Sequence, residues 1–356
     1  MARVAIAMSG GVDSAVAAFL LTQQGHDVIG VTMKLVEGQD EDGTCCSWKT
    51  INRAKSTCHK LGIPHYVFNF SRQFEDIVVQ DFCNNYRNAM TPNPCLRCNQ
   101  HIKFDALLSK VLACGVDYIA TGHYAIVEEG NNGRMWLRRG VDDKKNQSYT
   151  LYETSQEQLR HVIFPLGGLT KPEVRKIAEK NGLPSASASD SMGICFIPNG
   201  NYREFLGDSI DANPGDIYYA AEDRVVAKHN GLHNYTIGQR SGLGCVGSLK
   251  LYITHLDTEN NRVLVGPRID IPTRKCILSN LNWVSHEPLS TGEILNGMAE
   301  AGYGAKPYSA TMEILNDNKA EVFLPNNSRC LTPGQSLVLY DKDIILVGGI
   351  IEKSWN

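Results

Sequence analysis

The residues with the clearest chemical potential form the run Ser-Gly-Gly-Val-Asp-Ser at positions 9–14. An apolar segment precedes this run and an amphipathic segment follows it, which is the pattern of a strand, a glycine turn and a helix. Gly10 and Gly11 allow a tight turn and a close approach of the backbone to a ligand. Ser9, Ser14 and the N–H groups at the start of the helix would then face an anion, which the helix dipole favours.

Asp13 is the unusual member of this run. A carboxylate beside a phosphate is repulsive unless a cation lies between them, so the sequence indicates a magnesium–nucleotide complex rather than a bare phosphate. The alternative is a helix cap and a turn with nothing bound. The run is neither a Walker loop, because no Gly-Lys-Ser/Thr follows, nor the dinucleotide fingerprint.

Cysteines supply a second set of candidate reactive groups. The stretch 91–99, Thr-Pro-Asn-Pro-Cys-Leu-Arg-Cys-Asn, places Cys95 and Cys98 in a proline-stiffened loop just before an expected helix. The helix N-terminus and the nearby cations Arg97 and Lys103 would favour a thiolate there.

Three interpretations of this CxxC pair remain open: a redox or sulfur-transfer pair, half of a metal site, or two structural cysteines. A zinc site would need a second CxxC or a histidine pair, and Cys45 and Cys46 are too closely spaced to provide it. The other informative thiol is Cys195, in an apolar, strand-like run beside Gly193. Taken alone, Cys195 is best interpreted as a buried and inert thiol.

The segments around these residues alternate between strand-like and helix-like patterns, which predicts a parallel sheet with ligands at the carboxyl ends of its strands. Met33 and Gly122 stand at two such ends, near the expected adenine and ribose. The expected strands are 28–33, 65–70 and 118–120; the expected helices are 49–61, 74–90, 102–114 and 171–181; and a hairpin is expected at 124–127 and 135–139 around Asn-Asn-Gly.

Beyond residue 198 the pattern changes to short alternating runs separated by turns. We therefore expect an α/β catalytic domain over 1–197, a small mostly-β central domain over 198–272 and a β-barrel-like C-terminal domain over 273–356. The glycine pattern at 242–247 matches the dinucleotide fingerprint, but a strand follows it, so it indicates a loop.

Composition sets broad limits. The 356 residues are 42% hydrophobic and 21% charged, values typical of a soluble globular protein with two or three domains. With neither a long apolar run nor a cleavage signal, we expect a cytoplasmic protein with no membrane contact. Eleven cysteines then indicate thiol, persulfide or metal chemistry rather than a disulfide scaffold. The net charge of −3 neither supports nor excludes tRNA, and DNA is not expected.

Seven motifs occur in one order along essentially the whole chain, and together they resemble the tRNA-specific 2-thiouridylase family of PP-loop ATP pyrophosphatases. They are Ser-Gly-Gly-Val-Asp-Ser at 9–14, Thr-Pro-Asn-Pro-x-x-x-Cys-Asn at 91–99, Ala-Thr-Gly-His-Tyr at 120–124, Asn-Gln-Ser-Tyr at 146–149, Gly-Ile-Cys-Phe-Ile at 193–197, Gly-Gln-Arg at 238–240 and Thr-Pro-Gly-Gln at 332–335.

This resemblance implies an adenine-nucleotide alpha-hydrolase-like parallel sheet that carries the PP-loop. It also implies ATP-dependent 2-thiolation of the wobble uridine in tRNAs for lysine, glutamate and glutamine. The C2 oxygen is adenylated, with release of pyrophosphate, and leaves as AMP. By the same resemblance Cys195 carries a persulfide, donated by a cysteine desulfurase or a sulfur-relay protein. Cys98 is the nucleophile that releases the sulfur, leaving a transient Cys98–Cys195 disulfide.

The resemblance also assigns binding residues. For ATP they are Ala7, Met8, Ser9, Gly10, Gly11, Val12, Asp13, Ser14, Met33 and Gly122. The resemblance implies that Asp13 holds Mg²⁺ through the nucleotide. For the target base they are Asn93, Pro94 and Cys95, and for the rest of the tRNA they are His123, Lys145, Asn146, Gln147, Tyr303 and Gln335.

The chain departs from the family pattern at two places. Glycines flank Tyr303 where some members have arginines, which makes Lys306 a candidate substitute. Cys95 stands where some members have aspartate, so Cys95, Cys98 and Cys195 are candidate ligands of an iron–sulfur cluster. The alternative functions are another PP-loop adenylating enzyme, amide-forming or lysidine-type, and a non-catalytic tRNA-binding protein.

Overall fold

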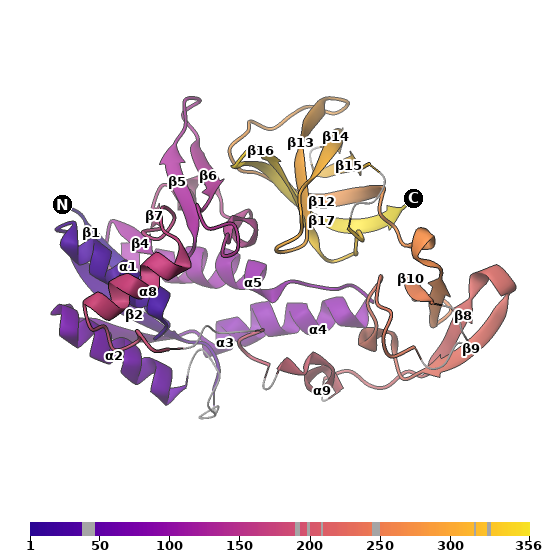
Figure 1. Ribbon diagram of the computed structural model, residues 1–356, viewed down its shortest axis with the longest axis horizontal. Coiled ribbons are helices and arrows are strands. Elements are labelled where there is room, and N and C mark those ends of the chain that lie inside the picture. Colours follow the sequence, from indigo (N-terminus) through magenta and orange to yellow (C-terminus); the bar gives the residue numbers. More distant parts are fainter. Residues whose placement is uncertain are drawn as a thin grey trace.

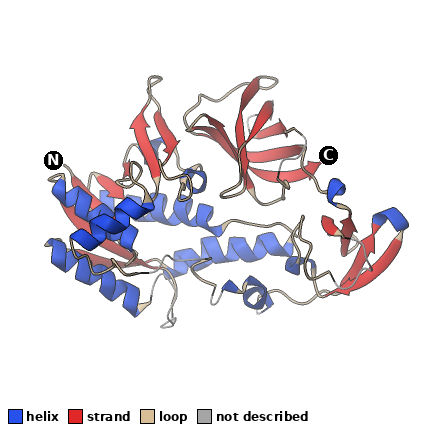
Figure 2. Ribbon diagram, viewed as in Figure 1, coloured by secondary structure: helices blue, strands red, loops and turns tan. Residues whose placement is uncertain are grey.

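The computed structural model describes residues 1–37, 47–188, 193–197, 200–207, 209–243, 250–316, 318–325 and 329–356. Cys45, Cys46 and most of the 242–247 glycine pattern lie outside these ranges. Within them the strands form three sheets. Figure 1 shows a helix-rich part that holds the N-terminus, a barrel that holds the C-terminus, and a smaller sheet at the far end of the molecule. Figure 2 shows that the longer helices gather around the first sheet or extend from it, with short ones near the small sheet.

The first sheet is parallel, with the strand order β3-β2-β1-β4-β7. Its strands are β1 (Arg3–Ala7), β2 (Asp27–Lys34), β3 (His65–Asn69), β4 (Tyr118–Ala120) and β7 (Val162–Ile163). Side chains of β1 alternate between two cores because successive residues of a strand point to opposite faces. Val4 and Ile6 pack toward one set of helices, whereas Ala5 packs toward the other. This two-sided burial explains why β1 and β2 are continuous apolar runs.

Helices cover both faces of this sheet. On the Val4 face lie α1 (Val12–Gln23), α2 (Trp48–Leu61) and α8 (Lys171–Lys180). On the Ala5 face lie α3 (Ser71–Phe74), α4 (Gln80–Arg87), α5 (Pro94–Arg97) and α6 (Leu108–Leu112). Wide π-helical turns at Glu75–Val79 and Cys98–Leu107 join α3 to α4 and α5 to α6 into two long helices. Such turns are rare and recur at functional sites.

The start of the second long helix corrects the sequence prediction, which placed it at 102 with the CxxC in a preceding loop. The helix begins at Pro94 instead, because Asn93 caps it: the Asn93 side chain accepts a hydrogen bond from the Cys95 N–H at 3.1 Å. Proline at the first helical position needs no N–H partner. Cys95 and Cys98 are therefore held in the first helical turns.

The last sheet is an antiparallel barrel, closed by pairing of its first and last strands. Its strands are β12 (Lys275–Trp283), β13 (Ile294–Ala301), β14 (Tyr308–Asn316), β15 (Lys319–Phe323), β16 (Ser336–Asp341) and β17 (Ile344–Trp355). The expected hairpin is present as β5 (Ala125–Glu129) and β6 (Met135–Arg139), and β6 pairs with β17. The hairpin thus extends the barrel sheet toward the parallel sheet.

The residues between these two parts in the sequence form a small sheet with the order β10-β11-β8-β9. Its strands are β8 (Gly215–Tyr219), β9 (Arg224–His229), β10 (Tyr252–Asp257) and β11 (Arg262–Gly266). The described part of the chain also contains two short α-helices, α7 (Gln156–Leu159) and α9 (Tyr202–Gly207), and several single 3-10 turns. The predicted fold class, a parallel α/β domain followed by a small mostly-β part and a β-barrel, is confirmed. None of the helices in the described part of the chain has the length and apolar character of a membrane span.

A buried polar contact joins the hairpin to the barrel. The Arg139 guanidinium lies 2.5 Å from the Glu300 carboxylate and 4.1 Å from the centre of the Tyr340 ring. Burial raises the pKa of Glu300, and the charge of Arg139 opposes that rise. Next to this pair, the hydroxyl of Tyr149 donates to the Ser336 carbonyl at 2.8 Å, and that of Tyr152 lies 2.9 Å from Ser336 Oγ.

Removing Arg139 should destabilise the protein, because it leaves the Glu300 carboxylate buried without its cation. We expect Arg139→Met to lower the free energy of unfolding by about 3 kcal/mol, measured by urea denaturation. The loss should grow with pH: a carboxyl whose folded-state pKa lies above its unfolded value binds more protons when folded, so stability falls as pH rises from about 4.3 through the folded pKa. Arg138→Met, a matched change at a half-exposed ion pair, should cost less than about 1 kcal/mol. Equal losses for both variants would contradict this interpretation.

Candidate functional site

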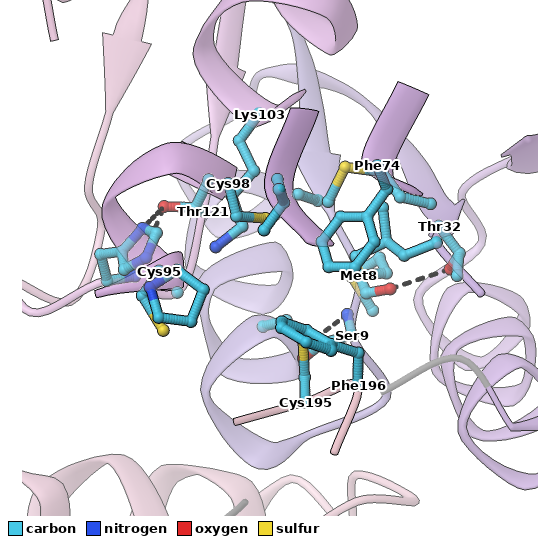
Figure 3. Close-up of a pocket in the computed structure, with 18 of the residues that line it drawn as sticks. Met8, Ser9, Thr32, Phe74, Cys95, Cys98, Lys103, Thr121, Cys195 and Phe196 are labelled. Atoms are coloured by element: carbon cyan, nitrogen blue, oxygen red, sulfur yellow. Dashed lines mark hydrogen bonds between the residues drawn. The ribbon is translucent and has the colours of Figure 1, made fainter. Parts of the chain in front are cut away.

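A cavity of about 340 Å³ opens at the carboxyl ends of the parallel strands. Figure 3 shows side chains that enter it from several elements. Of the residues predicted for binding or chemistry, those that line it are Ala7, Met8, Ser9, Asp13, Ser14, Met33, Pro94, Cys95, Cys98, Gly122, His123, Gln147 and Cys195. The structure therefore brings residues from positions 7 to 195 to one place.

The 9–14 loop wraps the start of α1. Ser14 Oγ donates to the Gly11 carbonyl at 3.1 Å and accepts from the Ser9 N–H at 3.3 Å. Gly10 has a φ of +76° and lies against α2, where a Cβ would overlap the carbonyl oxygen of Thr50. Both conditions exclude a side chain at position 10. Glycine at position 10 therefore allows the backbone conformation of the loop, and the hydrogen bonds of Ser14 stabilise it.

Asp13 faces the cavity and is held by two residues that the sequence did not predict. Lys171 Nζ lies 2.7 and 2.8 Å from its two carboxylate oxygens. The hydroxyl of Tyr124 donates to one of them at 2.7 Å. The sequence predicted Mg²⁺ as the cation beside this carboxylate, and that stays a prediction; nothing in the local pattern pointed to a lysine 158 residues away.

Residues of β2 and residues just after β4 pack against the 9–14 loop. The Thr32 hydroxyl donates to the Met8 carbonyl at 2.9 Å and lies 2.8 Å from His65 Nε2, so the imidazole must donate to Thr32. Burial lowers the pKa of His65, which favours its neutral form. Gly122 follows β4 and approaches the loop so closely that a Cβ there would lie 2.9 Å from the Ser14 nitrogen.

Two of the three candidate cysteines lie on different elements across the cavity (Figure 3). Cys98, which is 7% exposed, comes from the long helix that begins at Pro94, and Cys195 is partly exposed. Cys195 lies in a turn, so the predicted strand-like run is wrong. The next residue, Phe196, instead packs edge-on against the rings of Phe74 and Phe82, which anchors the turn.

The charges near Cys98 differ from expectation. Arg97 does not line the cavity: its guanidinium lies 3.4 Å from Glu153 and 3.7 Å from Asp81. The cation that lines the cavity beside Cys98 is Lys103, whose Nζ donates to Asn99 Oδ1 at 2.8 Å. Lysine rather than arginine therefore sets the local charge.

His123 also lines the cavity, and its imidazole is neutral. Burial, followed by the charge of Lys103, lowers the pKa of His123 well below its usual range. Its Nδ1 lies 2.7 Å from the Thr121 hydroxyl. The imidazole therefore offers hydrogen bonding without positive charge at neutral pH.

No group of three or more His, Cys, Asp or Glu side chains stands ready to bind a metal ion in the described ranges, which include Cys95, Cys98 and Cys195. Cys95, Cys98 and Cys195 nevertheless line one cavity, and their ligation of an iron–sulfur cluster stays a prediction.

Several predicted tRNA contacts already have partners within the protein. Gln335 Nε2 donates to the Thr91 carbonyl at 2.7 Å, Asn93 caps its helix, and Gln147 Oε1 accepts from the Tyr124 N–H at 3.0 Å. Asn146 is buried, and its side chain accepts from the Ser148 N–H at 3.2 Å. Their contacts with tRNA stay predictions.

Tyr303 is better exposed, at 48%, on the loop between β13 and β14. Burial of its inner part raises the pKa of Tyr303, Lys145 lowers it, and Cys95 raises it, so Lys145 and Cys95 each lie within electrostatic range of Tyr303. The ring centre of Tyr303 lies 6.3 Å from that of Tyr149. The barrel thus brings an aromatic side chain close to Cys95.

The close approach of Gly122 to the loop yields a stability prediction. Gly122→Ala should lower the free energy of unfolding by about 1–3 kcal/mol, because its methyl group would press on the backbone of Asp13 and Ser14. Gly168→Ala is the matched control, since a Cβ there meets nothing within 4 Å, and it should change stability by less than about 0.5 kcal/mol. Thermal and urea unfolding of both variants provide the measurement; an unchanged Gly122→Ala protein would rule out the tight contact.

Family models match most of the chain in three segments. They are described as a tRNA methyl transferase HUP domain at residues 2–199, a tRNA methyl transferase PRC-barrel domain at 203–267 and an aminomethyltransferase beta-barrel domain at 273–351.

Relatives that align over the full length identify the family more specifically than the three domain models. The chain is 42% identical over 361 residues to tRNA-specific 2-thiouridylase MnmA of Halothermothrix orenii, covering 100% of both chains. It is 45% identical over 359 residues to tRNA-specific 2-thiouridylase MnmA 1 of Caldanaerobacter subterraneus subsp. tengcongensis, covering 99% of this chain and 98% of the relative. With this identity over its whole length, and with the family's motifs gathered around one cavity, the chain belongs to the tRNA-specific 2-thiouridylase (MnmA) family.

Proposed function

We propose that this protein is a tRNA-uridine 2-sulfurtransferase that uses ATP to replace the C2 oxygen of the wobble uridine with sulfur. Its substrates are the tRNAs for lysine, glutamate and glutamine, and it acts in the cytoplasm. One observation carries the proposal: a single cavity is lined both by the 9–14 loop and by Cys98 and Cys195. An activating nucleotide and a sulfur nucleophile could therefore meet at one base.

The first step is adenylation of the base. ATP would bind along residues 7–14, with Met33 and Gly122 at its adenosine end, and Mg²⁺ would enter with its phosphates. The uridine O2 attacks the α-phosphorus, the bond to the β-phosphate oxygen breaks, and pyrophosphate leaves. The hydroxyls of Ser9 and Ser14 and the N-terminus of the 12-residue helix α1 suit the negative charge of the phosphates.

The second step is sulfur transfer. The terminal sulfur of a persulfide on Cys195 attacks C2, and AMP leaves with the former O2 atom. The Cys98 thiolate then attacks Cys195 Sγ, which breaks the sulfur–sulfur bond, leaves the thiocarbonyl on the base and forms a Cys98–Cys195 disulfide. A thiol reductant resets the disulfide, and a cysteine desulfurase or relay protein reloads Cys195. Lys103 offsets the negative charge that gathers in the cavity during both steps.

The cysteine roles predict a clear pattern among variants. Cys98→Ser and Cys195→Ser should each slow thiolation of unmodified tRNA at least about a hundredfold, measured by nucleoside mass spectrometry with ATP, Mg²⁺ and a persulfide donor. Both variants should still transfer AMP from ATP to the tRNA and release pyrophosphate for one turnover. Cys114→Ser, at an exposed thiol away from the cavity, should behave as wild type. Full activity in either the Cys98 or the Cys195 variant would exclude this mechanism.

A cluster-based variant of the reaction, with Cys95, Cys98 and Cys195 as ligands, is the alternative that the sequence raises, and these three thiols line one cavity. We expect protein purified without oxygen to contain no iron or sulfide above about a tenth of an equivalent and to be active with a persulfide donor. Cys95→Ser should keep most of this activity. Stoichiometric iron that is lost together with activity in Cys95→Ser would favour the cluster instead.

The same assays separate other functions. Pyrophosphate release that depends on ammonia or lysine would favour an amide-forming or lysidine-type ligase, whereas tRNA binding without AMP formation would favour a non-catalytic binding protein. The descriptions of the family models name methyl transfer. Mass spectrometry distinguishes that outcome directly, because methylation and exchange of oxygen for sulfur change the nucleoside mass differently.

A further inference from the structure

Lys171 occupies an unusual position for a lysine. It is the first residue of α8, where its N–H donates to Asp142 Oδ2 at 2.8 Å, and its side chain is only 10% exposed. The following turns of the helix pack into the apolar core through Val174 and Ala178. A buried ammonium loses most of its hydration, so a fold keeps one only where a partner compensates the charge.

The compensating group is the acidic residue of the 9–14 loop. Both Asp13 oxygens lie within 2.8 Å of Lys171 Nζ, and Tyr124, which is itself buried, donates its hydroxyl to one of them. Two short contacts from one ammonium and one from a phenol fix the carboxylate between α1 and α8. Such charge-assisted hydrogen bonds are stronger than neutral ones and define an orientation.

This arrangement answers the electrostatic problem that Asp13 raises. Asp13, Ser9 and Ser14 line the same cavity, so its carboxylate lies near the position of the nucleotide phosphates. In the proposed function an isolated negative charge there would repel ATP. With Lys171 bound to it, the pair has no net charge.

We propose that Lys171 is a positioning residue for ATP: it neutralises Asp13 and, with Tyr124, holds its carboxylate in place, so that Asp13 is paired with lysine rather than with Mg²⁺. This inference rests on the proposed ATP-dependent function. It assigns Mg²⁺ to the phosphates of the nucleotide and leaves the loop carboxylate to the protein.

The test measures ATP affinity by calorimetry at fixed and varied Mg²⁺, together with the melting temperature of each variant. Lys171→Met should weaken ATP binding about tenfold or more, because it leaves a bare carboxylate beside the phosphates. Asp13→Asn combined with Lys171→Met should bind ATP within about threefold of wild type, since both charges are gone. Tyr124→Phe keeps the ion pair and should weaken binding only about threefold.

One control and one further test make the result specific. Lys180→Met removes an exposed lysine from the last turn of the same helix and should leave ATP affinity unchanged. Asp13→Asn alone should leave the Mg²⁺ concentration at half-saturation unchanged. If Lys171→Met fails to fold, the ATP affinity of the double variant still tests the inference, because no unpaired charge remains in that protein.

Wild-type affinity in Lys171→Met would overturn the inference. So would a tenfold rise in the Mg²⁺ requirement of Asp13→Asn, or a double variant that binds ATP no better than Lys171→Met. These outcomes differ from failure of the proposed function: a wild-type protein that binds ATP but transfers no sulfur to tRNA refutes the function and leaves the role of Lys171 standing.

Discussion

The buried contact between Arg139 and Glu300 is the constraint on which the rest of the arrangement depends. It joins a hairpin of the α/β domain to the barrel, and Tyr340 stacks on the arginine. Because a buried charge is tolerated only when it is paired, this contact fixes how the hairpin and the barrel fit together. The barrel loop that bears Tyr303 is thereby kept close to Cys95.

Two adjacent barrel residues extend this constraint to the reactive helix. Gln335 donates to the Thr91 carbonyl, just before the helix that carries Cys98, and Ser336 bonds the Tyr149 and Tyr152 hydroxyls. Tyr152 donates in turn to Glu153, the partner of Arg97. The chain of contacts ends one residue before Cys98, so docking of the barrel and the position of this thiol are physically linked.

Local patterns were enough to predict much of this molecule. The glycine turn, the apolar strand before it, the helix after it and the Asn-Asn-Gly hairpin are encoded by neighbouring residues, and motif order pointed to the family. The start of the Cys98 helix was missed because the Asn93 cap and the π-helical turns give no apolar repeat of ordinary period. Arg97 was misassigned and Lys171 overlooked for one reason: their partners, Glu153 and Asp13, come from distant segments, and only the fold decides which charges meet.

The charges that the fold brings together explain how one cavity can receive several anions. Arg97 is neutralised outside it, His123 is held uncharged by burial, and Asp13 is paired with Lys171. Lys103 therefore faces the cavity without a carboxylate from any of these groups opposing it. A polyphosphate, a persulfide and an RNA backbone each bring negative charge, and in a site of low dielectric a single ammonium acts strongly on them. The fold thus prepares the cavity for anionic chemistry chiefly by neutralising charges at its edge.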